Sequence, residues 1–174
     1  MTIAIILARG GSQGIPRKNL AIVHGKPLLQ WTLEAALTSE VIKNVFVSSD
    51  DEDILKFAAN CGASQLSRPA ELSLGNSTSE SGWLHALSQI SKRNLPETFF
   101  ALQATSPFRD SFDLDNAYSS FYDYNYDSLF AAEEIKDHYI WKNIDKSLLP
   151  DNFIYEKRGM RQALENKYLE NGSF

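Results

Sequence analysis

The 174-residue sequence contains a single cysteine, Cys61, so it cannot form an internal disulfide bond. This scarcity excludes the disulfide-stapled folds of small secreted proteins and is typical of a reducing compartment. The sequence also has no internal repeat and no low-complexity stretch. Its apolar run near the N-terminus, residues 3–8, has no basic segment before it and is too short for a signal peptide or a membrane span. We therefore expect a soluble, cytoplasmic protein without a membrane partner.

Basic residues are fewer than acidic residues. Seventeen Lys and Arg residues against 22 Asp and Glu residues give a formal net charge of −5. This balance disfavours a generic nucleic-acid-binding protein, but it is compatible with a local basic pocket for a small anion. Hydrophobic residues make up 43% and charged residues 22%, a globular composition that excludes intrinsic disorder, collagen-like repeats and coiled coil. One domain with a real core is expected at this length.

Apolar strand-like segments alternate with helix-like segments along most of the chain. Residues 3–8 are continuously apolar, which is typical of a strand buried on both faces of a parallel sheet. Residues 44–49 and 98–103 are predicted to be further strands. Because helical patterns separate these strands, the sequence predicts an α/β fold, with a mostly parallel sheet and helices on both faces.

Four helices are predicted from their start signals. Two have the capping-box spacing, in which a serine is followed three residues later by a glutamate. Another helix is predicted to begin after a proline, and either of two polar side chains is expected to cap the fourth. The start signals are Ser49 with Glu52, Ser77 with Glu80, Pro27, and Asp110 or Ser111.

The regular alternation ends near residue 137. We therefore predict a nucleotide-binding core over residues 1–136 and an irregular segment over residues 137–174. The last four residues, Asn-Gly-Ser-Phe, are typical of a turn that enters a strand. On this pattern, the sequence is expected to be a truncated form of a longer protein.

A glycine-rich segment, residues 9–19, directly follows the first predicted strand. Ligands of open parallel sheets bind beyond the carboxyl ends of the strands, and free backbone N–H groups there form a concavity for anions. Arg9 and Lys18 add fixed positive charge. The segment matches neither the dinucleotide-binding fingerprint nor the Walker loop. The alternative is a flexible turn with solvated charges, but the place after a buried strand favours phosphate binding.

A second candidate segment, residues 102–109, also follows a buried strand. Gln103 is expected at the carboxyl end of that strand, over the same crevice as Arg9. A strand end followed by a simple Ser-Pro turn explains these residues equally well.

Two further segments have structural explanations that the residues favour. Ser77, in the Ser/Thr-rich residues 76–81, is best explained as a helix cap, although a helix N-terminus also binds anions. The basic cluster at residues 157–161 is best explained as a solvated face.

Several separated motifs nevertheless occur in the order of one known family. They are Ala8-Arg9-Gly10-Gly11-Ser12, Lys18-Asn19, Lys26-Pro27-Leu28, Val47-Ser48-Ser49-Asp50-Asp51, Arg68-Pro69-Ala70-Glu71-Leu72, Leu102-Gln103-Ala104-Thr105-Ser106-Pro107 and Arg161-Gln162. Over essentially its whole length, the sequence resembles the acylneuraminate cytidylyltransferases, the CMP-sialic acid synthetases. The related KDO cytidylyltransferases lack Gly-Gly-Ser in the first loop and carry an acidic metal-binding residue near the position of Gln103.

The resemblance implies a Rossmann-like nucleotidyltransferase fold and a homodimer that does not bind nucleic acid. It implies a reaction between CTP and a nonulosonic acid such as N-acetylneuraminic acid, with release of pyrophosphate and with Mg²⁺ as cofactor. The anomeric hydroxyl of the sugar would attack the α-phosphate of CTP. The alternatives are a catalytically inactive remnant that binds nucleotide or forms dimers, and a related transferase that uses another sugar.

The resemblance also implies roles for individual residues. The implied catalytic residues are Arg9, Lys18 and Arg161. The implied nucleotide-binding residues are Leu7, Ala8, Arg9, Gly10, Gly11, Ser12, Lys18, Asn19, Arg68, Ser77 and Ser79. The implied sugar-binding residues are Gln103, Thr105, Ser106, Gln162 and Tyr168, with residues 137–174 reaching toward a partner subunit. No metal ligands are assigned, because the acidic pair of the family has no counterpart up to Phe174. At Gln13 the family usually has a lysine.

Overall fold

The computed structural model describes residues 1–12, 14–90, 95–136, 138–157, 159–160, 162, 164, 166–172 and 174. The chain forms two compact units, Met1–Leu129 together with the C-terminal Phe174, and residues 130–172. The predicted assignment of nucleotide binding to residues 1–136 and of dimerisation to residues 137–174 stays a prediction. No helix of the described residues is long and apolar enough to cross a membrane.

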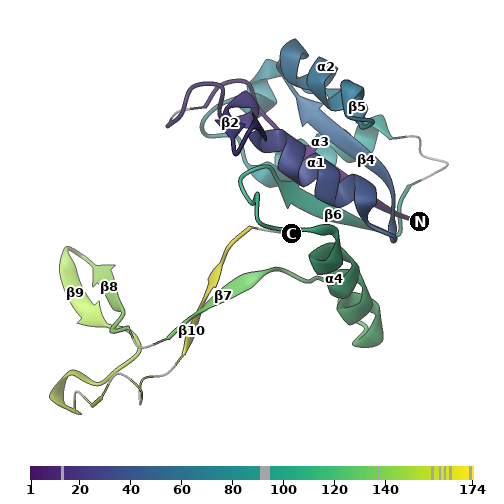
Figure 1. Ribbon diagram of the computed structural model, residues 1–174. Coiled ribbons are helices and arrows are strands. Elements are labelled where there is room, and N and C mark those ends of the chain that lie inside the picture. Colours follow the sequence, from purple (N-terminus) through teal and green to yellow (C-terminus); the bar gives the residue numbers. More distant parts are fainter. Residues whose placement is uncertain are drawn as a thin grey trace. The chain divides into compact units, whose positions relative to one another are not determined.

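The first unit is built on a four-stranded sheet with the strand order β5-β4-β1-β6 (Figure 1). The central strand β1 (Thr2–Leu7) pairs in parallel with β4 (Ile42–Ser49) and with β6 (Thr98–Gln103). The short strand β5 (Ser64–Ser67) pairs in parallel with β4. The predicted parallel sheet is confirmed, and its continuous apolar pattern has the expected cause, because residues 3–6 of β1 are fully buried.

Helices cover both faces of this sheet, as predicted. On one face, α1 (Leu28–Thr38), α2 (Glu52–Asn60) and α4 (Ser111–Asp123) share a core with alternate residues of β1. On the other face, α3 (Ser79–Gln89) packs against the remaining residues of β1 (Figure 1). The alternation of side chains along a strand therefore supplies two cores from one apolar run.

The predicted cap of α2 is wrong. The cap is Asp51, whose carboxylate accepts hydrogen bonds from the backbone N–H groups of Asp53, at 2.8 Å, and Ile54, at 3.2 Å. Ser49 is fully buried at the end of β4, and its hydroxyl accepts the N–H of Asp51 at 3.0 Å. A carboxylate at the helix N-terminus also interacts favourably with the helix dipole, which favours Asp51 over a serine two residues earlier.

The predicted cap of α3 is also wrong, by one residue. The hydroxyl of Thr78, and not that of Ser77, accepts the N–H of Ser81 at 3.3 Å. The predicted cap of α4 is confirmed, because Asp110 and Asp113 form a reciprocal capping box. The smaller elements of the first unit are η1 (Lys18–Leu20), β2 (Ile22–Val23), β3 (Lys26–Pro27) and η2 (Ala70–Ser73).

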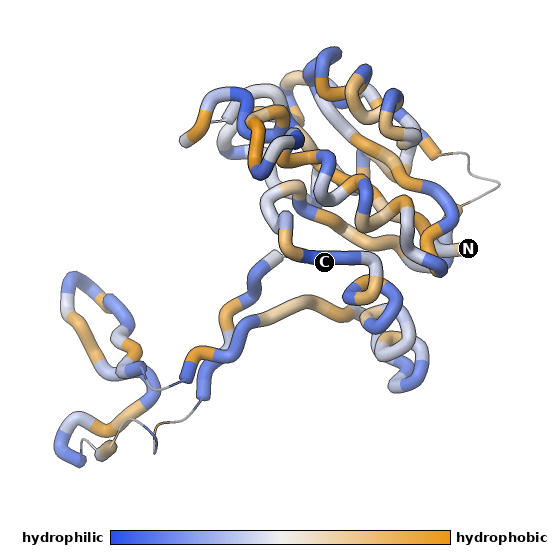
Figure 2. Tube along the Cα trace, in the orientation of Figure 1, coloured by the Kyte–Doolittle hydropathy of each residue, from blue (hydrophilic) through white to orange (hydrophobic). Residues whose placement is uncertain are grey.

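The second unit contains two antiparallel ribbons of two strands each. β7 (Ala132–Ile135) pairs with β10 (Lys167–Glu170), and β8 (Trp141–Ile144) pairs with β9 (Ser147–Pro150). A short helical turn, η4 (Tyr155–Lys157), follows β9. Hydrophobic and hydrophilic residues are mixed along this unit (Figure 2).

Asn152 is the one buried residue among the described residues of the second unit. Its side-chain amide bridges the backbone, accepting the N–H of Ile140 and donating to the carbonyl of His138, both at 2.8 Å. The ring of Phe153 packs edge-to-face against Trp141, with the centroids 5.1 Å apart. The order of this unit thus rests on a few local contacts and not on a shared core.

Candidate functional site

A cavity of about 320 Å³ opens in the first unit, where the carboxyl ends of β1 and β6 meet. This is the edge of a parallel sheet at which ligands bind. The cavity is lined by the end of β1 and the glycine-rich segment, by the chain around η2, by the start of α3 and by the end of β6. Its lining residues are Leu7, Arg9, Ser12, Lys18, Asn19, Arg68, Leu72, Ser73, Leu74, Gly75, Ser77, Thr78, Ser79, Trp83, Leu102, Gln103, Ala104 and Thr105.

Most of the predicted site residues of the first unit meet at this cavity. Those that line it are Leu7, Arg9, Ser12, Lys18, Asn19, Arg68, Ser77, Ser79, Gln103 and Thr105. Those of the first unit outside the lining are Ala8, Gly10, Gly11 and Ser106. Gln162 and Tyr168 belong to the second unit, where both are exposed, and Arg161 and Gln13 lie outside the described residues.

The charge of the lining is opposite to that of the chain. Arg9, Lys18 and Arg68 are cationic, and no Asp or Glu is among the residues that line the cavity in the described part of the chain. The whole chain carries a formal net charge of −5. A concave site with one sign of charge raises the local concentration of the opposite ion, so this cavity favours an anion.

Arg68 is the most deeply buried of the three cations, with 6% of its surface exposed. Its Nε donates to the hydroxyl of Ser73 at 2.9 Å, and its backbone N–H donates to the carbonyl of Ser49 at 2.8 Å. Burial lowers the pKa of the guanidinium, while the charge of Asp50 partly opposes that shift. An anion in the cavity would offset the cost of keeping this charge away from water.

Arg9 lies at the start of the glycine-rich segment. Both its side chain and its backbone carbonyl form hydrogen bonds. Its Nη1 donates to the carbonyl of Leu74 at 3.2 Å. Its carbonyl accepts a hydrogen bond from Nδ2 of Asn19 at 2.9 Å, and Asn19 is 6% exposed. Asn19 therefore fixes the path of the segment in addition to lining the cavity.

The start of the glycine-rich segment is tied to the chain around the N-terminus of α2. The N–H of Gly10 donates to a carboxylate oxygen of Asp50 at 3.0 Å. A Cβ atom on Gly10 would lie 2.7 Å from a carboxylate oxygen of Asp51, which is too close for any other residue without a shift. Position 10 thus requires a glycine, because the side chain of Asp51 lies close to the backbone there.

Arg17 forms ion pairs with two carboxylates at the N-terminus of α2. Its Nη2 lies 2.7 Å from Asp53 and 3.8 Å from Asp51, and its backbone has a positive φ of 51°. The hydrogen bond raises the pKa of Arg17 and lowers that of Asp53. Because Arg17 is engaged by these carboxylates, Lys18 is the cation of this pair that lines the cavity.

Residues with hydroxyl groups line the cavity at the start of α3. Thr78 and Ser79 line it at the N-terminus of this 11-residue helix, where the helix dipole is positive. The hydroxyl of Ser77 donates to the carbonyl of Glu71 at 2.8 Å, so it braces the preceding loop and does not cap the helix.

Polar side chains of a different kind lie at the end of β6. The hydroxyl of Thr105 donates to the side-chain oxygen of Gln103 at 3.4 Å. Both side chains are exposed and line the cavity. This end of the site therefore offers neutral hydrogen-bonding groups, whereas the cations come from the glycine-rich segment and from Arg68.

Several lining residues are missing from the predicted set. They are Leu72, Ser73, Leu74, Gly75, Thr78, Trp83, Leu102 and Ala104. Leu74 contributes a backbone carbonyl to Arg9, a role that no side-chain pattern indicates. A usable signal did exist, because residues 73–75 connect two segments that the motifs singled out, Arg68-Pro69-Ala70-Glu71-Leu72 and residues 76–81.

A basic cavity at the carboxyl edge of a parallel α/β sheet is typical of Rossmann-like folds. Comparison with known proteins makes this assignment specific. Residues 3–148 match a family model described as cytidylyltransferase. The chain therefore belongs to the cytidylyltransferase family, as the sequence motifs predict.

Curated relatives carry the name of the predicted activity. The chain is 36% identical to N-acylneuraminate cytidylyltransferase A of Danio rerio, over 98% of this chain and 40% of that protein. It is 46% identical to N-acylneuraminate cytidylyltransferase of Escherichia coli, over 63% of this chain and 25% of that protein. It is 32% identical to the protein of that name from Streptococcus agalactiae, over 98% of this chain and 42% of that protein. The chain thus spans less than half the length of these relatives.

Solved structures share the fold. CMP:2-keto-3-deoxy-manno-octonic acid synthetase complexed with CTP matches with a TM-score of 0.64 and 19% identity, over 78% of this chain and 54% of that one. A 4-diphosphocytidyl-2C-methyl-D-erythritol synthase from Anaerococcus prevotii matches with a TM-score of 0.62 and 19% identity, over 86% of this chain and 61% of that one. The predicted Rossmann-like nucleotidyltransferase fold is confirmed.

Proposed function

We propose that this chain binds CTP in the 320 Å³ cavity and transfers its cytidylyl group to a sialic-type nonulosonic acid such as N-acetylneuraminic acid. The observation that carries the proposal is the cavity lining, which has three cations and no carboxylate among the described residues of a cytidylyltransferase-family chain. Relatives named N-acylneuraminate cytidylyltransferase support the choice of acceptor.

The reaction is a nucleotidyl transfer. The anomeric hydroxyl oxygen of the sugar forms a bond to the α-phosphorus of CTP, the bond from that phosphorus to the bridging oxygen breaks, and pyrophosphate leaves. The proton of the hydroxyl passes to water. Arg9 and Lys18 would stabilise the charge on the phosphates, and Arg68 would hold the nucleotide. Most of the rate enhancement in such a site comes from positioning and electrostatic stabilisation.

The acceptor is assigned to the other end of the cavity. Gln103 and Thr105 supply neutral donors and acceptors, which suit the hydroxyl and amide groups of a sugar acid. Ser106 follows them and belongs to the same proposed sugar site. The division of the lining into a cationic end and a neutral end supports a triphosphate at one and a sugar at the other.

Mg²⁺ is proposed as the cofactor. In proteins this ion is typically held by one or two carboxylates together with substrate phosphates, and it neutralises phosphate charge. The described residues contain no group of three His, Cys, Asp or Glu side chains that could hold a metal by themselves. Phosphate oxygens of CTP would supply ligands to the ion in this proposal.

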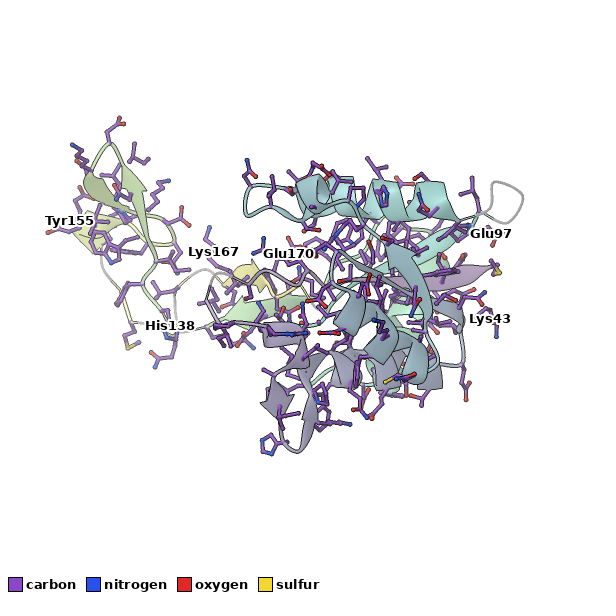
Figure 3. All side chains as sticks on the ribbon, turned by 90° about the horizontal axis from the view of Figure 1, so that it is seen from above. Lys43, Glu97, His138, Tyr155, Lys167 and Glu170 are labelled. Atoms are coloured by element: carbon purple, nitrogen blue, oxygen red, sulfur yellow. The ribbon has the colours of Figure 1, made fainter. Side chains whose placement is uncertain are left out.

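A second copy of the chain is proposed to pack on the second unit. Two-stranded ribbons are marginally stable alone, and most of the large hydrophobic side chains of this unit are exposed. The exposed ones are Phe130, Trp141, Ile144, Leu148, Leu149, Ile154, Tyr155, Met160, Tyr168 and Leu169. Tyr155, labelled in Figure 3, is 67% exposed. Roles for Arg161, Gln162 and Tyr168 at the site of the partner copy are part of this proposal.

The test is a pyrophosphate-release assay with CTP, Mg²⁺ and N-acetylneuraminic acid, in which CMP-sugar and pyrophosphate are expected in equal amounts. ATP and GTP in place of CTP are expected to give no product. Binding of CTP without any product would favour the inactive nucleotide-binding remnant. Product with another sugar acid alone would favour the related transferase.

A further inference from the structure

Arg109 is a buried arginine that does not line the cavity. It follows β6 in the loop before α4, and 5% of its surface is exposed. Burial lowers the pKa of its guanidinium to about 10, with the charge of Asp113 opposing the shift. The side chain is therefore still charged at neutral pH. Removing a charge from water costs free energy that its contacts must offset.

Hydrogen bonds from Arg109 and from Thr32 meet at one backbone carbonyl. Its Nη2 donates to the hydroxyl oxygen of Thr32 at 3.0 Å and to the carbonyl oxygen of Gln103 at 3.4 Å. The hydroxyl of Thr32, which is fully buried on α1, donates to the same carbonyl at 3.3 Å. The last residue of β6 thus accepts hydrogen bonds from Thr32, 71 positions earlier in the sequence, and from Arg109, in the loop that follows the strand.

That carbonyl controls the orientation of the neutral end of the cavity. It belongs to the planar peptide group that joins Gln103 to Ala104, so fixing it fixes the direction in which the chain leaves β6. Gln103, Ala104 and Thr105 all line the cavity, and the hydroxyl of Thr105 donates to the side chain of Gln103.

We propose that Arg109 is a positioning residue for acceptor recognition. Through the Gln103 carbonyl, it holds the Gln103 amide and the Thr105 hydroxyl where they bind the sugar acid. Lysine cannot replace it, because its side chain is one atom shorter and places no nitrogen where Nη2 donates to both oxygens. This inference rests on the proposed function, since it names a residue that supports the acceptor end of the same site.

A purely structural role would be to fasten α1 to α4, and the chain offers a matched control for that role. The hydroxyl of Ser39, at the end of α1, donates to Asp115 on α4 at 2.6 Å and is part-buried. Ser39 and Asp115 are both absent from the cavity lining. Ser39→Ala therefore loosens the same pair of helices without touching Gln103.

The first test is amide hydrogen exchange of the whole chain. Arg109→Lys is expected to speed exchange at residues 104 and 105 by about tenfold, as expected from losing a charge-assisted hydrogen bond. Ser39→Ala is expected to leave exchange at these two amides unchanged, even where it lowers the melting temperature. Arg109→Gln serves as a second variant that removes the charge. Unchanged exchange at residues 104 and 105 in both Arg109 variants would overturn the proposal.

The second test separates acceptor from nucleotide. In Arg109→Lys, the KM for N-acetylneuraminic acid is expected to rise about tenfold while the KM for CTP changes by less than about twofold. Equal increases in both KM values, or the same acceptor effect in Ser39→Ala, would show a structural role and overturn the proposal. If the unmodified chain makes no product, the proposed function fails, and the exchange experiment still decides whether Arg109 holds residues 103–105.

Discussion

The two units of the chain bury their side chains to very different extents. In the first unit, β1 carries four fully buried residues in a row, and helices cover both faces of the sheet. In the second unit, Asn152 is the one buried residue in its described part. A closed core fixes the first unit by itself, whereas the second unit exposes the apolar surface that an interface needs. This difference supports the proposals that the first unit binds nucleotide and that the second unit contacts a partner copy.

The largest expected effect is on stability, from truncating the core of the first unit. Ile5→Ala in β1 should lower the free energy of unfolding by about 2–5 kcal/mol, because Ile5 is fully buried. Ile154→Ala in the second unit is the comparison, since Ile154 is 62% exposed within the chain and its loss should change the unfolding of the first unit by less than about 0.5 kcal/mol. Urea unfolding measures both. An equal decrease in the free energy of unfolding in both variants would contradict the difference in packing between the two units.

The next effect separates binding from stability within the first unit. Arg68→Met removes a buried cation and should weaken CTP binding by about 1.5–3 kcal/mol, since a charge-assisted contact is lost. Its melting temperature without CTP should be unchanged or higher, because the cost of burying the charge disappears. Calorimetry and thermal unfolding measure the two quantities. A variant that melts earlier but binds CTP normally would make Arg68 a structural residue.

A smaller effect tests the second unit as an interface. Leu148 lies in β9 and is 64% exposed, so Leu148→Asp places a charge on the proposed contact surface. The dissociation constant of the dimer should rise by about tenfold or more in sedimentation equilibrium. CTP affinity of the first unit should stay the same. A chain that sediments as a monomer before the substitution would contradict the dimer.

The smallest effect concerns the tie between the glycine-rich segment and α2. Arg17 holds the pKa of Asp53 below its ordinary value, so the pair is present at neutral pH and is lost as the pH falls through that lowered pKa. Asp53→Asn should mimic the low-pH state at pH 7 and speed tryptic cleavage after Lys18. Below that pKa, Asp53 of the unmodified chain is protonated and uncharged, so the two chains should differ little in thermal unfolding at such a pH. Cleavage that does not depend on Asp53 would show that the pair does not restrain the segment.

The central strands and the cationic end of the site could be predicted from the sequence because one-dimensional patterns specify them. Residues 3–8 and 99–102 are apolar without interruption, and the glycine-rich segment directly follows the first of these runs. β5 (Ser64–Ser67) was not predictable in this way, since its sequence Ser-Gln-Leu-Ser has no apolar run and its place depends on pairing with β4.

Features that depend on tertiary contacts were out of reach. Asp51, and not Ser49, caps α2, because the hydroxyl of Ser49 accepts the N–H of Asp51 instead. The Leu74 carbonyl and the Arg109 side chain act through partners 65 and 77 positions away in the sequence. No local spacing indicates contacts of this kind.

The central claim is that the cavity of the first unit binds the triphosphate of CTP. Calorimetric titration of CTP into Arg9→Ala and into Arg17→Ala tests it most directly, because both arginines lie in one segment but Arg9 alone lines the cavity. Arg9→Ala should lose about 1.5–3 kcal/mol of binding free energy with an unchanged fold. Arg17→Ala should keep CTP affinity within about threefold. Unchanged affinity in Arg9→Ala, or an equal loss in both variants, would contradict the assignment.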